Sequence, residues 1–397
     1  MILEVWIMEI VKGAGRVFTQ PFLYIAIIIG FILTRRRIKS ERRQFGTRIY
    51  DAFSEWSGTL GTSLTAGLLM SVFAVGSGLV LSMPLLLLVS GVLLVLSLPL
   101  RSNWYSAAYT LGATYLVIYF LPYFPENIRQ LSWVSPFTNT PLTAVPFLIS
   151  AFLLVEGILM LRTSSLSTFP ERVMGRRGMW IGQHRSRKLA LIPFFALFPA
   201  GSIEPFAPWW PVFGIGEESF GLILVPFVTG WEWIARGQLP VKAAKIVGRR
   251  TFFLALLVLS LAAGSLFLPI LSIAAVVVSL LGRTWIRLQH LSGEKRQPFF
   301  SASQDGLLIL GIIPKSPAAQ MGLSPGELII RVNNRQVRTE NDFYEALQEN
   351  AAFNKIEVHD VQGENRYVQR PLYEGEHYEL GLVFVEPPRR EKSVSVY

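Results

Sequence analysis

A series of long apolar runs, separated by short basic segments, constrains this chain more than any other feature. A helix of about 20 apolar residues is long enough to cross the hydrocarbon core of a bilayer. The last run, 251–281, has room for two short spans with a break at Gly264–Ile270. The sequence therefore predicts an α-helical membrane domain of about eight or nine spans. The runs lie near residues 17–34, 58–78, 82–100, 104–124, 142–161, 189–208, 211–230 and 251–281.

The composition agrees with this prediction and excludes several chemistries. Hydrophobic residues make up 51% of the 397 residues and charged residues only 16%, which is too apolar for a soluble globule of this size. The chain has no cysteine, so disulfide bonds, thiolate zinc sites and cysteine nucleophiles are excluded.

The formal net charge of +10 is unevenly distributed. Residues from Pro298 onward carry 10 Lys and Arg against 14 Asp and Glu, whereas the preceding residues carry 27 against 13. The basic excess falls between the apolar runs, near 35–48, 162–188, 236–250 and 282–290. Cytoplasmic loops are enriched in Lys and Arg, so this pattern indicates membrane topology and not nucleic-acid binding. An even number of expected spans separates each basic segment from the next, so all four segments can lie in the cytoplasm. This topology predicts an external N-terminus and a cytoplasmic tail.

From Gly306 the sequence has the pattern of a small soluble α+β domain. Ser316, followed by proline, stands at an N-cap position. Thr339 and Asp342 have the spacing of a capping box, and the Asn333–Asn334 pair suits a tight turn. Strands are expected over 306–313, 328–332, 355–361, 365–372 and 379–385, and helices over 316–322 and 339–350.

The tail resembles a PDZ domain through the stretches SPAAQMG and GLSPGELIIRVNN and the helix and strands that follow. Glu327 stands where the family usually has Asp, and Asn334 stands where it usually has Gly. The family's peptide-binding loop is absent upstream of Gly306, and its match is Leu380–Val383. We therefore expect a partly open β-barrel or sandwich with two helices, circularly permuted so that the C-terminus supplies the loop-bearing strand.

This loop and strand are the predicted binding site. Backbone N–H groups of the loop would hold a peptide carboxylate, while the peptide adds as a strand between the loop-bearing strand and the second helix. The alternative is that ELGLVFV is an edge strand without a ligand. The predicted peptide-binding residues are Leu380, Gly381, Leu382, Val383, Phe384, Val385, Phe343 and Leu347.

The residue sets of intramembrane proteases are absent from the sequence. No expected span contains an Asp pair or the His-Glu-x-x-His of a zinc protease. Ser77 in VGSGL has no histidine in an expected span to activate it, and helix contacts through small residues explain it better. The four histidines are His184, His290, His359 and His377. We therefore expect no enzyme activity, no cofactor and no metal.

Transport is a further alternative, because carboxylates within membrane spans are costly and are functional candidates by default. Glu156 lies within an expected span, and Glu204 lies in a segment rich in Pro and Trp. No pair of matching broken helices accompanies them.

The order of parts resembles the MinJ family of cell-division topological determinants from Bacillus-type bacteria. The match is carried by RIKSERRQFGTRIYD after the first run and by the tail SPAAQMGLSPGELIIRVNN…HYELGLVFV. The resemblance implies a non-enzymatic adaptor or scaffold at the division septum and cell poles. It implies that a DivIVA-like polar scaffold recruits the protein, which recruits MinD with the division inhibitor MinC and contacts other division proteins.

The sequence thus predicts a polytopic membrane domain over 1–290, a linker over 291–300 and a cytoplasmic PDZ domain over 301–397. A multi-pass protein of the cell membrane, in contact with its lipids, is expected. The sequence is compatible with an oligomer. It predicts neither the peptide specificity nor whether the membrane domain or the PDZ domain binds the partner. Two alternatives stay open: a PDZ-regulated membrane protease or its inactive relative, and a transporter that uses Glu156.

Overall fold

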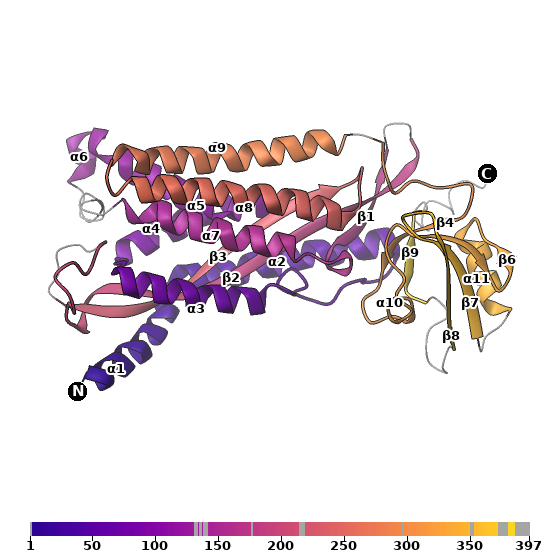
Figure 1. Cartoon of the computed structure of the whole chain (residues 1–397), viewed down its shortest axis with the longest axis horizontal. Coiled ribbons are helices and arrows are strands. Elements are labelled where there is room, and N and C mark those ends of the chain that lie inside the picture. The colour runs from indigo at the N-terminus through magenta and orange to yellow at the C-terminus, as the bar shows by residue number, and fades with distance from the viewer. Residues whose placement is uncertain are drawn as a thin grey trace.

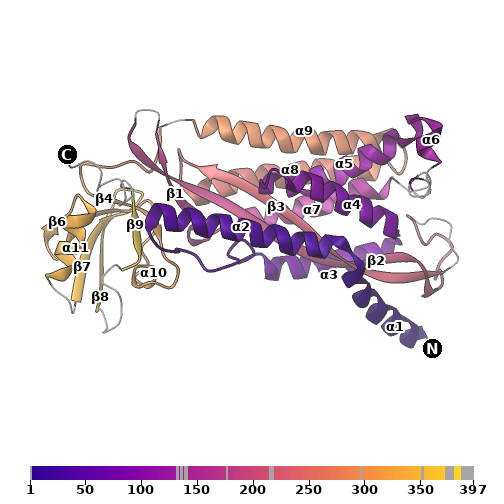
Figure 2. The same ribbon diagram turned by 180° about the vertical axis from the view of Figure 1, so that it is seen from behind.

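The computed structural model of the chain describes residues 2–130, 134, 137, 142–175, 178–213, 219–295, 297–349, 353–371 and 380–385. The molecule is elongated (Figure 1). A long part, in which helices surround a strand hairpin, makes up most of its length, and a small α/β part caps one end. The N-terminus lies at the opposite end from the α/β part (Figures 1 and 2).

The helical part contains most of the helices expected from the apolar runs. Its α-helices are α1 Ile2–Gly15, α2 Pro21–Phe45, α3 Leu60–Ser77, α4 Met83–Ser97, α5 Ala107–Phe120, α6 Glu126–Arg129, α7 Ala144–Leu161, α8 Pro240–Gly264 and α9 Ile270–Gly293. Short 3₁₀ turns are η1 Arg16–Thr19, η2 Ser102–Tyr105, η3 Leu121–Tyr123 and η5 Ser165–Ser167. The predicted break between two helices at 264–270 is confirmed, whereas α1 was not predicted.

Several of these helices are apolar and long enough to cross a membrane. Within the described residues, α3, α7, α8 and α9 meet this criterion by length and composition. The pair α1 and α2, bent by 53° at Gln20, brings the number to five if the pair counts as one span.

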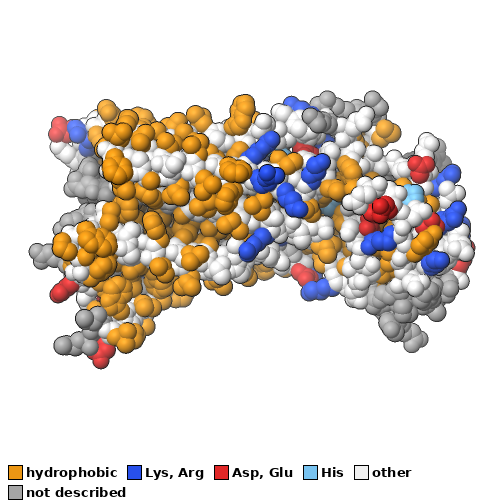
Figure 3. All heavy atoms as spheres, viewed as in Figure 1, with side chains coloured by type: hydrophobic (Ala, Val, Ile, Leu, Met, Phe, Trp, Pro, Cys, Tyr) orange, Lys and Arg blue, Asp and Glu red, His pale blue; other side chains and the backbone are white. Residues whose placement is uncertain are grey.

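The basic segments expected as loops are largely helical. α2 continues through the segment at 35–48 as far as Phe45, and α8 begins within the segment at 236–250. The basic ends of α2, α8 and α9 gather where the helical part meets the α/β part (Figures 1 and 3). The predicted segregation of basic residues to one end of the molecule is therefore present.

The prediction of helices over 189–208 and 211–230 is wrong. These residues belong to β2 (Trp180–Ile203) and β3 (Phe220–Ala235), which pair as a long antiparallel hairpin. A third strand, β1 (Phe169–Met174), pairs with the first residues of β2. The hairpin runs along the helical part and returns, as two spans would, so the even count between basic segments survives the error (Figure 1).

Burial on both faces explains why these strands look like spans in the sequence. No residue of β3 is exposed, and most of β2 is buried or partly buried. A strand covered on both faces reads as a continuous apolar run, without the alternation that marks a half-buried strand. Run length alone therefore indicated a helix.

The outer edge of β2 is closed by α3 and by proline. The N–H of Phe195 donates to the Ser71 hydroxyl at 2.8 Å. The N–H of Leu197 donates to the Leu79 carbonyl at 2.9 Å. Pro193, which has the same orientation in the strand, has no N–H to satisfy.

The outer edge of β3 is closed by polar side chains from the start of the chain. Gln20 donates to the Leu224 carbonyl at 2.7 Å, and Arg16 donates to the Leu222 carbonyl at 2.5 Å. Pro226 lies opposite the proline of β2. Because non-helical backbone at membrane depth is tolerated only where protein surrounds it, this closure makes the hairpin compatible with a membrane.

The α/β part is an antiparallel sheet of order β8-β7-β5-β4-β9, with β6 beside β5. Its elements are β4 Leu307–Ile312, α10 Pro317–Gln320, β5 Leu328–Val332, β6 Arg335–Gln336, α11 Glu340–Gln348, β7 Phe353–His359, β8 Asn365–Pro371 and β9 Leu382–Phe384. Every predicted strand and helix of this part is present, with small shifts at the ends. β9 lies beside β4, as the predicted permutation requires, and the permutation itself stays a prediction.

The predicted turn and capping residues of this part are confirmed. The Ser316 hydroxyl accepts the N–H of Ala319 at 3.3 Å and opens α10. Thr339 and Asp342 form a reciprocal capping box at the start of α11. Asn333–Asn334 has positive φ at both residues, 50° and 65°, as a tight turn between paired strands needs.

A docking cluster of apolar side chains joins the two parts. Its buried members are Ile49, Tyr50, Phe169, Phe300, Leu310, Val383 and Val385. Backbone groups reinforce it, because the N–H of Gly182 donates to the Phe300 carbonyl at 2.7 Å. Phe300, expected at the end of the linker, is fully buried in this cluster. The predicted domain boundaries stay predictions.

A buried histidine also links the parts. His184 of β2 donates from Nε2 to the Leu310 carbonyl of β4 at 2.6 Å, and its Nδ1 lies 2.9 Å from the Thr168 hydroxyl. The carbonyl can only accept, so Nε2 carries the proton of a neutral ring. Burial lowers the pKa of His184 to about 4, so the ring is neutral at pH 7.

Candidate peptide-binding groove

A groove of about 700 Å³ lies between the α/β part and the basic end of α2. β9 and the residue before it form one wall, α11 forms a second, and α2 with the residues that follow it forms a third. Figure 2 shows the end of α2 beside β9. The predicted PDZ strand and helix therefore share a groove, and a segment far away in the sequence completes it.

The side chains of β9 point alternately into two apolar cores. Leu382 and Phe384 belong to the core of the α/β part, whereas Val383 and Val385 belong to the docking cluster. These predicted site residues are all buried. The strand's contribution to binding would therefore come from its backbone edge.

The helix wall differs from the predicted one. Phe343 and Leu347 are buried in the core of the α/β part, and the rings of Phe343 and Phe384 lie 5.2 Å apart. The groove is lined instead by Glu340 and Tyr344, one helical turn apart on the neighbouring face. Phe343 and Leu347 mark the face of α11 that packs into the core. The neighbouring face, with Glu340 and Tyr344, lines the groove, and it was not identified from the sequence.

The predicted loop is a sharp turn in the left-handed region. Leu380 has φ 42° and Gly381 has φ 80°, immediately before β9. A side chain at Gly381 would overlap Ser316 at the start of α10. The carbonyl of Gly381 accepts the N–H of Ile313 at 2.8 Å, which ties the turn to the end of β4. Glycine is required here by both backbone conformation and space.

α2 brings positive charge to the groove. The side chains of Lys39, Arg42 and Arg43 are exposed and line it, and Glu340 faces them from α11. Sequence reasoning assigned these cations to topology alone. Only the tertiary arrangement shows that they lie opposite the predicted loop.

A buried ion-pair network fixes the end of α2. Arg37 lies 2.8 Å from the carboxylate of Glu55 and 2.7 Å from that of Glu41. The second oxygen of Glu41 accepts the N–H of Ile49 at 3.0 Å. These contacts hold the chain after α2 against the helix, so the basic wall of the groove is preorganised.

Arg172 of β1 joins the helical part to the outer edge of β9. Its Nε donates to the Phe384 carbonyl at 3.0 Å, and its Nη1 donates to the Gln44 carbonyl at 3.1 Å. The Phe384 carbonyl points away from β4, on the edge that a peptide strand would join. Arg172 therefore occupies one backbone acceptor of that edge.

The candidate catalytic residues are placed without a catalytic arrangement. Ser77 ends α3, and its hydroxyl donates to the carbonyl of Ala74 at 3.4 Å. His184 donates to the Leu310 carbonyl within β4, and His290 donates to the Ile234 carbonyl near the end of β3. His377 lies outside the described residues. Over the described ranges, no cluster of three or more His, Asp and Glu is arranged to hold a metal.

Glu156, the candidate for transport, is fully engaged by neighbouring groups. Its carboxylate accepts from the Ser106 hydroxyl at 2.8 Å, from the Ala107 N–H at 2.9 Å and from the Thr229 hydroxyl. The guanidinium of Arg283 lies 3.5 Å away. Glu156 thus joins α7 to α5, β3 and α9. The other acid considered, Glu204, is exposed after β2.

Comparison with known proteins first defines the class. The PDZ domain family profile matches residues 308–357, within the α/β part. The chain is thus a PDZ-bearing protein with several helices apolar and long enough to cross a membrane. No solved structure matches it.

Full-length relatives then define the family. The chain is 36% identical to the cell division topological determinant MinJ of Bacillus subtilis (strain 168), over 98% of each chain. It is 24% identical to the probable cell division topological determinant MinJ of Lacticaseibacillus paracasei, over 94% of this chain and 96% of the relative. The chain belongs to the MinJ family.

Proposed function

We propose that this protein is a non-enzymatic membrane adaptor in division-site selection. It links a DivIVA-like polar scaffold to MinD, and through MinD to the division inhibitor MinC. The observation that carries the proposal is the similarity to a cell division topological determinant over nearly the whole chain. The protein acts at the septum and poles as a multi-pass membrane protein, with its basic end and PDZ domain in the cytoplasm.

In this proposal the groove beside α2 is one partner site. An extended segment adds to the outer edge of β9 and places a terminal or side-chain carboxylate at the Leu380–Gly381 turn. Lys39, Arg42 and Arg43 support this, because they favour an acidic ligand by charge complementarity. The bound segment takes over the Phe384 carbonyl from Arg172, so binding is coupled to the contact between the two parts.

The test uses the full chain in detergent and measures retention of purified MinD and of purified DivIVA-like scaffold. Reversing the groove charges with Lys39→Glu and Arg43→Glu should weaken one of these interactions about tenfold or more. The matched control is Lys242→Glu with Lys245→Glu, which reverses two exposed charges on α8 outside the groove. A second pair is Tyr344→Ala in the groove and Tyr367→Ala on the exposed face of β8.

These variants are better probes than substitutions at the turn. Leu382→Asp would place a charge in the core of the α/β part, and any side chain at position 381 would be strained. Equal retention by the groove variants and their controls would rule out the groove as the partner site. A wild-type chain that retains neither partner would contradict the adaptor function itself.

A further inference from the structure

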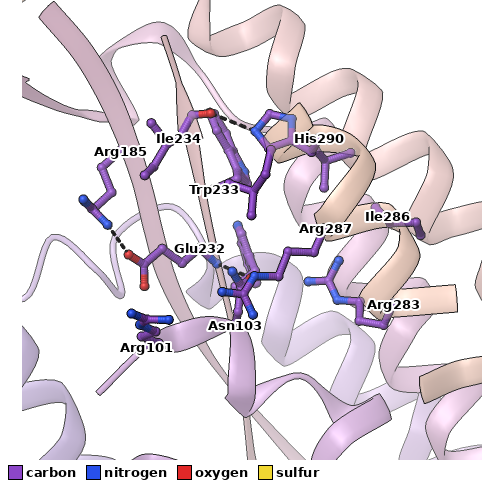
Figure 4. A pocket seen from close by; sticks show the side chains of 13 residues that line it. Arg101, Asn103, Arg185, Glu232, Trp233, Ile234, Arg283, Ile286, Arg287 and His290 are labelled. Atoms are coloured by element: carbon purple, nitrogen blue, oxygen red, sulfur yellow. Dashed lines mark hydrogen bonds and ion pairs between the residues drawn. The ribbon is translucent and has the colours of Figure 1, made fainter. Parts of the chain in front are cut away.

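A second cavity lies in the helical part, separate from the groove (Figure 4). It has a volume of about 220 Å³ and is bounded by β3, by η2 with the residue before it, and by the last turns of α9. Pockets for drug-sized ligands measure about 300–1,000 Å³, so this one suits a small polar group. The last turns of α9, which bound the cavity, lie toward the end of the helical part where the basic segments gather (Figure 1).

The walls of this cavity are strongly cationic. Among the described residues, four arginines and a single carboxylate line it. That carboxylate, Glu232, is already neutralised, because it lies 2.5 Å from Arg185 and 3.3 Å from Arg187. It also accepts the N–H of Ser102 at 3.2 Å. Glu232 therefore does not offset the remaining arginines.

Two of those arginines have no acidic partner within the described residues, namely Arg101 and Arg287. Arg287 lies over the ring of Trp104, 6.0 Å from its centre. Arg283, one turn earlier on α9, is held by Glu156 at 3.5 Å. Figure 4 shows Arg101, from just before η2, around the same space as Arg283 and Arg287 of α9. Such converging guanidinium groups favour an anion.

A neutral donor faces the same space, beside the rings of Trp231 and Trp233 that also line the cavity. Asn103 accepts the N–H of Glu232 through its side-chain oxygen at 3.0 Å, which leaves its NH₂ group to donate. An oxygen acceptor bound in the cavity would receive a hydrogen bond from this amide.

We propose that this cavity binds a phosphate group. Guanidinium forks match the oxygens of a phosphate in geometry and charge, and the amide and arginine donors supply further hydrogen bonds. The group would come from the headgroup of an anionic phospholipid or from a phosphate compound in solution. The site is distinct from the peptide groove, so it serves as a second, independent ligand site on this chain.

The experiment uses the full chain and measures its thermal midpoint and tryptophan fluorescence. One arm compares nanodiscs of phosphatidylcholine with nanodiscs that also contain phosphatidylglycerol. The other arm adds inorganic phosphate to the detergent-solubilised chain, with chloride at equal ionic strength as the blank. A rise in midpoint with phosphatidylglycerol alone identifies a headgroup, and a rise with inorganic phosphate identifies a soluble source. No response in either arm overturns the proposal.

Variants show whether the cavity is responsible. Arg101→Gln with Arg287→Gln should raise the concentration of phosphatidylglycerol or phosphate needed for half the response about tenfold or more. The matched control, Lys245→Gln with Arg249→Gln, removes the same charge from the exposed face of α8 and should respond like the wild type. Arg101→Gln alone, at an exposed position, gives a second variant in which folding is not at risk. Equal responses from the cavity variants and the control would overturn the assignment.

Discussion

Glu156 and Arg283 form a buried ion pair, and the groups around it indicate that the pair has a structural role. Both side chains are nearly inaccessible, and hydroxyl and backbone donors from α5 and β3 complete the carboxylate's hydrogen bonds. Removing one partner of such a pair leaves the other charge buried without compensation. An acid that carried a substrate or proton would need to exchange these partners.

Glu156→Gln should therefore destabilise the helical part by about 3–5 kcal/mol. Thermal unfolding in detergent measures the effect, and Glu204→Gln, at an exposed acid, is the control. A Glu156→Gln chain as stable as the control would show that the pair does not hold the helices together and would favour the transport alternative.

At the scale of elements, α3 packs closely against β2 at one glycine. A Cβ added at Gly67 of α3 would overlap the carbonyl oxygen of Pro193 in β2. Gly61 and Gly76 of the same helix have open space where a Cβ would stand. One glycine of α3 is therefore required by packing, whereas two others are not.

Gly67→Ala should lower the free energy of unfolding by about 1–3 kcal/mol, because either α3 or the hairpin must shift. Gly61→Ala and Gly76→Ala should be neutral or stabilising by up to about 1 kcal/mol, through the higher helix propensity of alanine. Chemical or thermal unfolding of the three variants makes the comparison. Equal effects at all three positions would contradict the close packing of α3 on β2.

The hairpin also shows which kind of information a single sequence lacks. The turns of the α/β part follow from residues such as Ser316 and Asn333, whose preferences act within a few positions. The strand state of 189–203 depends on partners outside the segment, because α3 caps one edge of it and β3 pairs with the other. Pro193 and Pro226 were the local signs of a strand edge, and they are equally compatible with a kinked span.

For the whole molecule, the docking of the two parts depends on a neutral His184. In the docked state burial lowers its pKa to about 4, from an ordinary value of 6.5. Below pH 6.5 the undocked state binds a proton that the docked state does not, so docking weakens as the pH falls toward 4. Above pH 6.5 neither state binds this proton, and docking is independent of His184 titration.

Lowering the pH from 7 to 5 should therefore weaken docking by about 2 kcal/mol. The chain has no cysteine, so a variant with both Lys242→Cys and Tyr367→Cys can carry two spin labels. The distance between the labels reports whether the two parts are docked. His184→Gln keeps a donor for the Leu310 carbonyl and should remove the dependence between pH 7 and 5. A pH dependence that persists in His184→Gln would assign it to another group.

Sequence alone determined the properties that act locally or through composition. It identified the apolar helices, the basic end, the PDZ elements with their caps and turns, and the MinJ resemblance. Tertiary structure decided what depends on distant contacts: the β2–β3 hairpin, the basic wall that Lys39 and Arg43 give the groove, and the cavity between Arg101 and Arg287. The reason is physical, since caps and turns are set within a few residues, whereas burial on both faces of a strand and the convergence of charges exist only once distant elements have packed.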